Sequence, residues 1–406
     1  IFKDARIITL EENYRSTQPI LNLANAIIAE AREKYEKNLF TQKKGEILPF
    51  YVETRDEHAQ SRYVADKILE LREEGVELSD IAVLFRSSWH SNDLEVELSR
   101  RNIPFVKYGG QKFVEAAHIK DVISYLRIAY NPHDEVSWYR ALLLMRGIGP
   151  KTAEKIINEV IHSGNPAMLD GAFSKKFTDL NKLIGILEDI DLNKHPPAEL
   201  INVFLEYYLP LLRERYDDFN RRINDLDSLG RIASRYNSIE QFLSDMALEP
   251  PERNIIEAGR RDADDSSLTL STIHSAKGLE WQAVFVIYVA EGHIPSYLSL
   301  ENEDDIEEER RLLYVAATRA KDTLFLLKPH IERSSRSRMD DGGLIFTRES
   351  RFLDSKIISG GLLKLENASL RRQDDGWQGY DYYIGKAEED REFLREMNDY
   401  FGEGPE

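Results

Sequence analysis

The sequence predicts an α/β fold whose sheet-forming part is interrupted by an all-helical segment. Short runs rich in β-branched and aromatic residues, several followed by helix-period segments, occur before residue 110 and again after residue 266, which is typical of α/β proteins. Between these regions the strand pattern disappears, and the sequence indicates consecutive helices. The strands on either side are too few for two ordinary sheets, so we expect them to form one parallel sheet.

The expected elements follow from two periodicities. Apolar β-rich runs predict strands at residues 6–10, 48–53, 80–85, 268–273, 283–289 and 323–327. Apolar residues at helical spacing predict helices at residues 119–129, 137–144, 152–162, 200–216 and 238–246. We therefore expect a discontinuous α/β domain made of residues 1–109 and 266–357, with an inserted helical domain at residues 110–265.

The remaining segment, residues 358–406, is expected to be an acidic C-terminal tail. Its last part is rich in Asp and Glu, and five apolar side chains fall on one helical stripe: Phe393, Leu394, Met397, Tyr400 and Phe401. This pattern predicts one amphipathic helix that docks on a partner protein.

The composition is that of a globular protein. A chain of 406 residues with 42% hydrophobic residues is long enough for about two or three domains with cores. The sequence has no cysteine and no apolar run of the roughly 18 residues that a membrane span needs, so we expect a cytoplasmic protein without a membrane partner. It begins with Ile1 directly before a strand-like run, which we interpret as a piece of a longer protein. The net charge of −18 argues against strong non-specific binding to nucleic acid, so any DNA contact must be local.

Polar residues directly follow three of the predicted strands. Residues 11–17 follow the first, residues 86–88 follow the third, and residues 274–280 follow the fourth. In open α/β sheets, ligands bind beyond the carboxyl ends of the strands. We therefore expect these three segments to converge at one edge of the sheet.

A fourth polar segment, residues 307–321, has the pattern of a helix with acids in its first turn. Leu312, Val315, Ala316 and Arg319 share one stripe at helical spacing, so Arg319 should emerge near an edge of the sheet. The alternative for this arginine alone is a structural ion pair or a place on a solvated face.

Taken together, these segments resemble a known family. Residues 10–17 (LEENYRST), 272–281 (TIHSAKGLEW) and 307–321 (EEERRLLYVAATRAK) look like motifs IV, V and VI of superfamily 1 DNA helicases of the UvrD/Rep type, in the same order and spacing. The resemblance covers residues 6–353. It implies a second RecA-like motor domain with a 2B-like helical insert, in the C-terminal half of an ATP-dependent 3′-5′ DNA helicase or translocase.

The resemblance also implies which residues bind the nucleotide. Arg15 and Arg319 would reach the γ-phosphate of ATP, Tyr14 would stack on the adenine, and Glu280 would bond the ribose. An arginine supplied to a phosphoryl-transfer site is worth roughly 10³–10⁵ in rate. Taken singly, Tyr14 could instead pack in the core, and Glu280 could be an acid on a helix surface.

The sequence lacks a phosphate-binding loop of the type Gly-x-x-x-x-Gly-Lys-[Ser/Thr]. The nearest segment, residues 379–386, is one residue too long and follows no convincing strand. We therefore expect ATP with Mg²⁺ to be bound mainly by an N-terminal motor domain that this sequence does not include, and the chain alone to be unable to hydrolyse ATP.

Five residues are candidates for contacts with single-stranded DNA, and the resemblance implies a channel across the motor domains. They are Arg86, Ser88, His274, Ser296 and Phe352. Ser88 stands where the family often has Asn, and Ser296 where His is common. Packing in the core is the alternative for Phe352, and a buried structural histidine is the alternative for His274.

A glycine-rich turn in the insert is a candidate for contact with the duplex at a junction of single- and double-stranded DNA. Gly147 and Gly149 flank Ile148, and Lys151 follows at the expected start of a helix, where backbone N–H groups can receive a phosphate. The turn resembles the duplex-contacting hairpin of the family. The alternative is a simple connection between two helices.

The helicase interpretation has alternatives, which the sequence supports less well. The nine histidines do not cluster as metal ligands do, so we expect no metal site. A non-catalytic DNA or protein interaction module derived from a helicase would have decayed motifs, whereas Arg15, Glu280 and Arg319 are all present. A helicase fused to a nuclease would need an Asp…Glu-x-Lys cluster, and residues 358–406 contain none.

Overall fold

A computed structural model describes residues 11–32, 38–163, 176–248, 267–333 and 344–368. The strand expected at residues 6–10 and the amphipathic helix expected near the C-terminus lie outside the described residues. No helix within the described ranges is long and apolar enough to cross a membrane.

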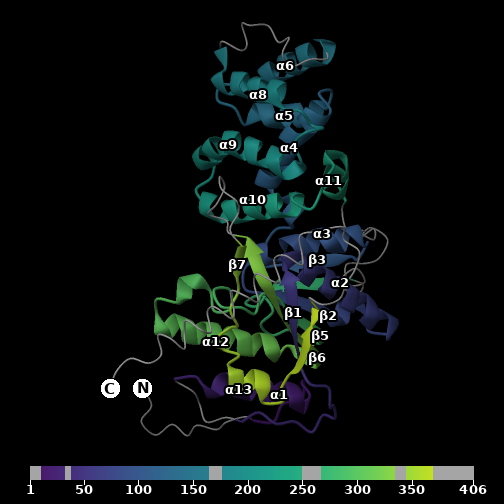
Figure 1. The fold of residues 1–406 in the computed structure, drawn as a ribbon, viewed down its shortest axis with the longest axis vertical. Coiled ribbons are helices and arrows are strands. Elements are labelled where there is room, and N and C mark those ends of the chain that lie inside the picture. Colours follow the sequence, from purple (N-terminus) through teal and green to yellow (C-terminus); the bar gives the residue numbers. More distant parts are fainter. Residues whose placement is uncertain (1–10, 33–37, 164–175, 249–266, 334–343, 369–406) are drawn as a thin grey trace. The chain divides into compact units, whose positions relative to one another are not determined.

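An eight-stranded sheet forms the α/β part of the chain (Figure 1). Its strand order is β3-β4-β2-β5-β6-β1-β8, all neighbours on this path are parallel, and β7 pairs antiparallel with β6. The strands come from both sides of the helical segment, so the expectation of one shared sheet is confirmed. Their bounds are β1 Phe50–Asp56, β2 Ile81–Phe85, β3 Phe105–Tyr108, β4 Leu268–Thr272, β5 Trp281–Val286, β6 Ala320–Arg333, β7 Leu344–Phe346 and β8 Lys364–Asn367.

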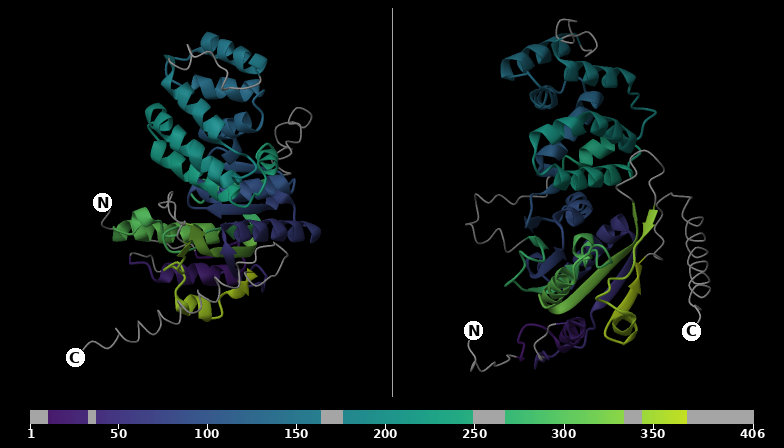
Figure 2. Two further views of the ribbon diagram at one scale, coloured as in Figure 1. Left: turned by 45° about the horizontal axis from the view of Figure 1, so that its top comes forward. Right: turned by 90° about the vertical axis from the view of Figure 1, so that its left-hand side faces the viewer.

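Helices cover both faces of the sheet (Figure 2). Helices α1 (Gln18–Ala29) and α12 (Glu303–Ala317) pack on one face, and α2 (Glu57–Glu73) and α3 (Asn92–Arg100) pack on the other. Alternate residues of β2 enter the two cores: Ala82 and Leu84 join the first, and Val83 and Phe85 join the second. Because both faces are buried, the strand is a continuous apolar run in the sequence.

The helical segment has a core of its own. The structure describes seven α-helices here, of which the sequence predicted all but α8 and α10. Large buried side chains such as Tyr125, Trp138, Phe204 and Tyr208 hold this core together. The bounds are α4 Ala117–Tyr130, α5 Glu135–Leu143, α6 Pro150–Ser163, α8 Thr178–Asp189, α9 Pro197–Arg215, α10 Phe219–Ala233 and α11 Ile239–Asp245.

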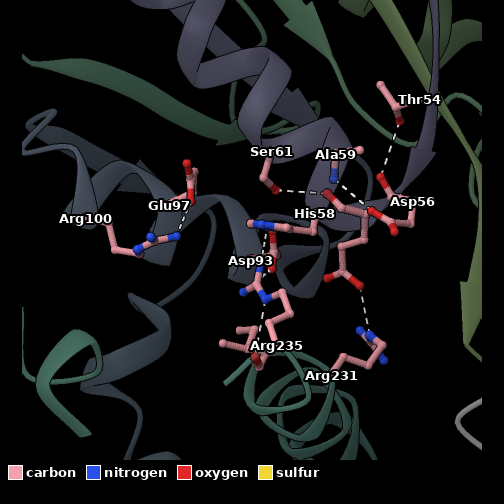
Figure 3. Close-up of polar contacts among 12 residues, drawn as sticks. Thr54, Asp56, His58, Ala59, Ser61, Asp93, Glu97, Arg100, Arg231 and Arg235 are labelled. Carbon is pink, nitrogen blue, oxygen red and sulfur yellow. Dashed lines mark hydrogen bonds and ion pairs between the residues drawn. The ribbon is translucent and has the colours of Figure 1, made fainter. Parts of the chain in front are cut away.

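Buried ion pairs join α10 to the helices of the sheet (Figure 3). The Arg231 guanidinium donates to Glu57 at the start of α2, with 2.8 Å between Nε and Oε2. Arg235 pairs with Asp93 of α3 at 2.6 Å between Nη2 and Oδ1, and His58 lies beside the same carboxylate. Burial acts to raise the pKa of Asp93, but the charges of Arg235 and His58 prevail and lower it. The junction is therefore polar and tightly paired.

Two boundaries differ from the sequence prediction. The predicted tail begins too early, because β8 pairs with β1 and places residues up to 367 in the sheet. The predicted helix at residues 307–321 is too long at its C-terminal end, because α12 ends at Ala317 and Lys321 already belongs to β6. Arg319 therefore lies in the turn between α12 and β6 and not on the helix.

Candidate nucleotide and nucleic-acid sites

The residues expected at the nucleotide gather at one edge of the sheet. Glu280 directly precedes β5, and Arg319 directly precedes β6. These strands are parallel, with Trp281 opposite Ala320, so both side chains lie at the amino-terminal edge. The segment of Arg15 joins them because the Ser16 hydroxyl donates to the Ala320 carbonyl at 2.6 Å.

Two arginines and one carboxylate lie together at this edge. Arg15 Nε donates to Glu280 Oε2 at 2.5 Å, and Arg15 Nη1 donates to the carbonyl of Thr318 at 3.2 Å. Arg319 is held by backbone carbonyls, with Nη1 3.0 Å from Leu279 O and Nε 3.1 Å from Val315 O. We define Arg15, Glu280, Arg319 and Lys321 as the arginine cluster.

Positive charge exceeds negative charge in the arginine cluster. A hydrogen bond from Arg15 and the charge of Lys321, whose Nζ lies 3.3 Å from Oε1, lower the pKa of Glu280. Burial and the charge of Arg15 lower the pKa of Arg319, which means that the two guanidinium groups repel each other. The arginine cluster thus holds three cations and one carboxylate. The donor set fits an added anion such as a phosphate group.

The surroundings decide between the alternatives for Tyr14 and Glu280. Tyr14 is 81% exposed and its hydroxyl donates to Glu12 at 2.7 Å, so packing in the core is wrong. Glu280 lies in the loop before β5 and not on a helix. Sequence reasoning missed Lys43, which donates to the carbonyls of Arg15 and Lys321 at 2.9 and 3.2 Å. Lys43 thus attaches the Arg15 segment to β6, and no local pattern could have revealed this.

The candidates for DNA contact meet at the opposite edge of the sheet. Strands β2 and β4 are parallel neighbours that end together, with Phe85 opposite Thr272. The residues that follow them line a cleft of about 1350 Å³, which we call the carboxyl-edge cleft. Its lining includes four of the five candidates, Arg86, Ser88, His274 and Ser296.

The expectation that three strand ends converge is therefore corrected. The segments after β2 and β4 do meet, but Arg15 lies at the other edge, with the residues that precede β5 and β6. Residues 273–280 run from the carboxyl end of β4 to the amino end of β5, so His274 and Glu280 are separated by the length of the sheet. This one loop connects the cleft to the arginine cluster.

Arg86 is oriented by a carboxylate that sequence reasoning missed. Its Nε and Nη2 lie 2.8 and 2.7 Å from Oε1 of Glu309, a residue of α12 whose side chain is 3% exposed. The same carboxylate accepts from Ser299 Oγ at 3.2 Å. Glu309 lies three and four positions before Leu312 and Leu313 on the buried stripe of α12. A carboxylate on the apolar stripe of a helix becomes buried, so its presence in the sequence indicates a cationic or hydrogen-bonding partner in the core.

The remaining candidates differ in how accessible they are. Phe352 is 1% exposed and packs in a core beneath the guanidinium of Arg310, so the core alternative describes it and it does not line the cleft. His274 is exposed, so the alternative of a buried histidine is wrong. Within the described ranges, no group of three or more His, Asp or Glu side chains is arranged to hold a metal ion.

The glycine-rich turn of the insert is open to solvent. Gly147 has a φ of +74°, a conformation that favours glycine, and Gly149 precedes Pro150 at the start of α6. A Cβ built on Gly149 would meet nothing within 4 Å. Lys151 is exposed, whereas Ile148 is buried in the helical core and anchors the turn.

Comparison with known proteins agrees with this arrangement. The model of the UvrD-like helicase C-terminal domain family matches residues 8–329. ATP-dependent DNA helicase PcrA of Staphylococcus epidermidis is 33% identical over 395 residues, which cover 91% of this chain and 52% of that protein. PcrA of Staphylococcus aureus is 32% identical over 396 residues, with the same coverage. The chain thus spans about half the length of the curated relatives that it matches.

Solved structures also match the chain. One of them is the C-terminal domain of a possible DNA helicase from Lactobacillus plantarum WCFS1, which is 13% identical with a TM-score of 0.34 and covers 87% of this chain and 98% of that chain. At this TM-score the likeness carries no argument, and the assignment rests on the sequence matches. The chain belongs to the family of UvrD-like helicase C-terminal domains.

Proposed function

We propose that the chain is the C-terminal half of an ATP-dependent 3′-5′ DNA helicase or translocase. The observation that carries the proposal is the arginine cluster, in which Arg15, Arg319 and Lys321 lie at one edge of the sheet with a single carboxylate, Glu280, that pairs with Arg15 and Lys321. The relatives are named ATP-dependent DNA helicases, which agrees with a nucleotide as the anion.

In this function, Arg15 and Arg319 contact the γ-phosphate of ATP with Mg²⁺, which an N-terminal motor domain binds through its own phosphate-binding loop. Charges that are already in place stabilise the transition state without further reorganisation. The carbonyls of Val315 and Leu279 hold Arg319 in such a position. Tyr14 is exposed and can stack on the adenine, and Glu280 can accept from the ribose while it orients Arg15.

Single-stranded DNA is the proposed ligand of the carboxyl-edge cleft. Arg86 supplies a charge for a phosphate, and Ser88, His274 and Ser296 supply hydrogen-bonding groups on the same lining. Local groups of this kind suit a chain whose net charge is −18, since a broad basic surface is not needed. The turn at Gly147 and Gly149 is the proposed contact with the duplex at a junction.

The test is to mix the 406-residue chain with an N-terminal motor domain of the family and to measure DNA-stimulated ATP hydrolysis. The chain alone should not hydrolyse ATP, and the mixture should. In the mixture, Arg319→Ala should lower the rate by roughly 10³–10⁵-fold. Arg311→Ala is the matched control, because Arg311 pairs with Glu308 on the exposed side of α12. If the mixture that contains Arg319→Ala hydrolyses ATP at the same rate as the unaltered mixture, the proposed role of Arg319 at the γ-phosphate is ruled out.

The same experiment separates the helicase from a non-catalytic interaction module. A module of that kind would bind DNA or a protein, including a partner of the acidic tail, without supporting hydrolysis in any mixture. Retained single-strand binding with no stimulated hydrolysis would therefore favour the module.

A further inference from the structure

The loop between β5 and α12 presents two large apolar side chains to solvent. Tyr297 is 64% exposed and Leu298 is 91% exposed, and both line the carboxyl-edge cleft with Arg86 and His274. Single exposed apolar side chains are ordinary at protein surfaces, but two adjacent ones on the lining of a cleft form a surface that a ligand can cover.

The Tyr297 ring is held in place although it is exposed. Its backbone N–H donates to the Gly292 carbonyl at 3.0 Å. A Cβ on Gly292 would lie only 2.3 Å from Cε2 and Cζ of the ring, so the ring packs directly against the glycine backbone. Glu309 accepts from the Ser296 N–H at 3.4 Å and from Ser299, which secures the loop on both sides of the tyrosine.

A fixed aromatic ring with an accessible face suits one class of ligand in this cleft. Bases of single-stranded nucleic acid stack on such rings whatever their sequence, while nearby cations and hydroxyls take the phosphates. Arg86, Ser88 and Ser296 supply those groups on the same lining. Leu298 offers apolar area but no aromatic ring. Of the two side chains, only Tyr297 can therefore stack on a base.

We propose that Tyr297 is a stacking platform for a base of single-stranded DNA in the carboxyl-edge cleft. This inference rests on the proposed function and deepens it, because it names a DNA-binding residue outside the motif positions. Stacking of this kind is preorganised, since the loop is already ordered by Gly292 and Glu309 before any ligand arrives.

The experiment is a pair of titrations of the 406-residue chain followed by fluorescence anisotropy. One labelled strand is an oligothymidylate, and the other is a strand of equal length whose nucleotides are abasic. Tyr297→Ala should weaken binding to the oligothymidylate by roughly 5- to 150-fold, the range for one stacked base, and should leave binding to the abasic strand nearly unchanged. Tyr130→Ala is the matched control, because Tyr130 at the end of α4 is 45% exposed and does not line the cleft, and it should change the affinity for neither strand by more than about twofold.

Two further variants keep the test independent of folding. Tyr297→Phe keeps the ring and should bind the oligothymidylate like the unaltered chain, whereas Tyr297→Leu keeps apolar bulk and should bind like Tyr297→Ala. Equal losses on both strands, or full affinity in Tyr297→Leu, would overturn the stacking role alone. An unaltered chain that binds neither strand would overturn the DNA part of the proposed function as well.

Discussion

The ion pair between Arg86 and Glu309 connects the two candidate sites. Arg86 follows β2 at the carboxyl-edge cleft, and Glu309 lies on the helix that leads to Arg319, with 2.7 Å between Nη2 and Oε1. The eight residue steps from Glu309 to the end of α12 at Ala317 correspond to about 12 Å along the helix axis, and Arg319 follows in the turn. We therefore expect α12 to transmit a displacement of Arg319 to the carboxylate that orients Arg86.

Breaking this pair should destabilise the chain. Glu309→Gln removes the charge that compensates a partly buried guanidinium, and loss of one partner of a buried pair costs about 3 kcal/mol or more. Glu308→Gln is the control, because Glu308 is exposed and its loss should cost at most about 1 kcal/mol. The measurement is urea unfolding followed by tryptophan fluorescence. Equal midpoints for the two variants would contradict a structural role for the pair.

Much of the fold could be predicted, and the two missed strands at the ends of the sheet order have a common cause. Continuous apolar runs revealed β2, β4 and β5, which lie inside the sheet. The short strands β3 and β8 form its two edges, and each has four residues that include a lysine, so neither is a continuous apolar run. At the sites, motif positions were predictable, whereas Glu309 and Lys43 act through contacts with residues far away in the sequence.

The sequence alone could have shown that Glu280 and His274 lie at opposite edges of the sheet. Glu280 stands immediately before an apolar run, and His274 stands immediately after one. In a parallel sheet, those two positions belong to different edges. Of the three polar segments, only those after β2 and β4 line the cleft beyond the carboxyl ends of the strands.

Glu280→Gln should have opposite effects on two ligands of the arginine cluster. Removing the carboxylate charge frees Arg15, so inhibition by inorganic tripolyphosphate should become stronger. Loss of the proposed ribose contact should raise the KM for ATP. Both quantities are measured in the mixture with an N-terminal motor domain. A KM that falls together with the inhibition constant would exclude the ribose contact and leave only a role in orienting Arg15.

His90 should make stability depend on pH. Burial, His293 and Arg86 hold its pKa well below the ordinary 6.5. The unfolded chain therefore binds a proton below pH 6.5 that the folded chain does not, so stability falls as the pH falls. From pH 7.5 to 5.5 the loss from this one group should be about 1.4 kcal/mol.

The matched variant for this prediction is His90→Phe. A phenyl ring can keep the stacked contact that His90 makes with Tyr288, whose ring centroid is 4.6 Å away, and it cannot be protonated. Urea unfolding at both pH values should show a smaller loss in the variant than in the unaltered chain. Identical losses would assign the pH dependence to other groups.

The glycine-rich turn offers two substitutions with different structural costs. Gly147→Ala forces an alanine to a φ of +74° and should destabilise the chain by about 1 kcal/mol. Gly149→Ala places its methyl group in open space and should leave stability nearly unchanged.

If a duplex phosphate approaches the backbone here, the methyl group of Gly149→Ala should weaken duplex binding at least several-fold and spare single-strand binding. The control is Gly185→Ala in α8, which also meets open space. Gly149→Ala with unaltered duplex affinity would leave the turn as a connection between helices, because nothing but the methyl group has changed.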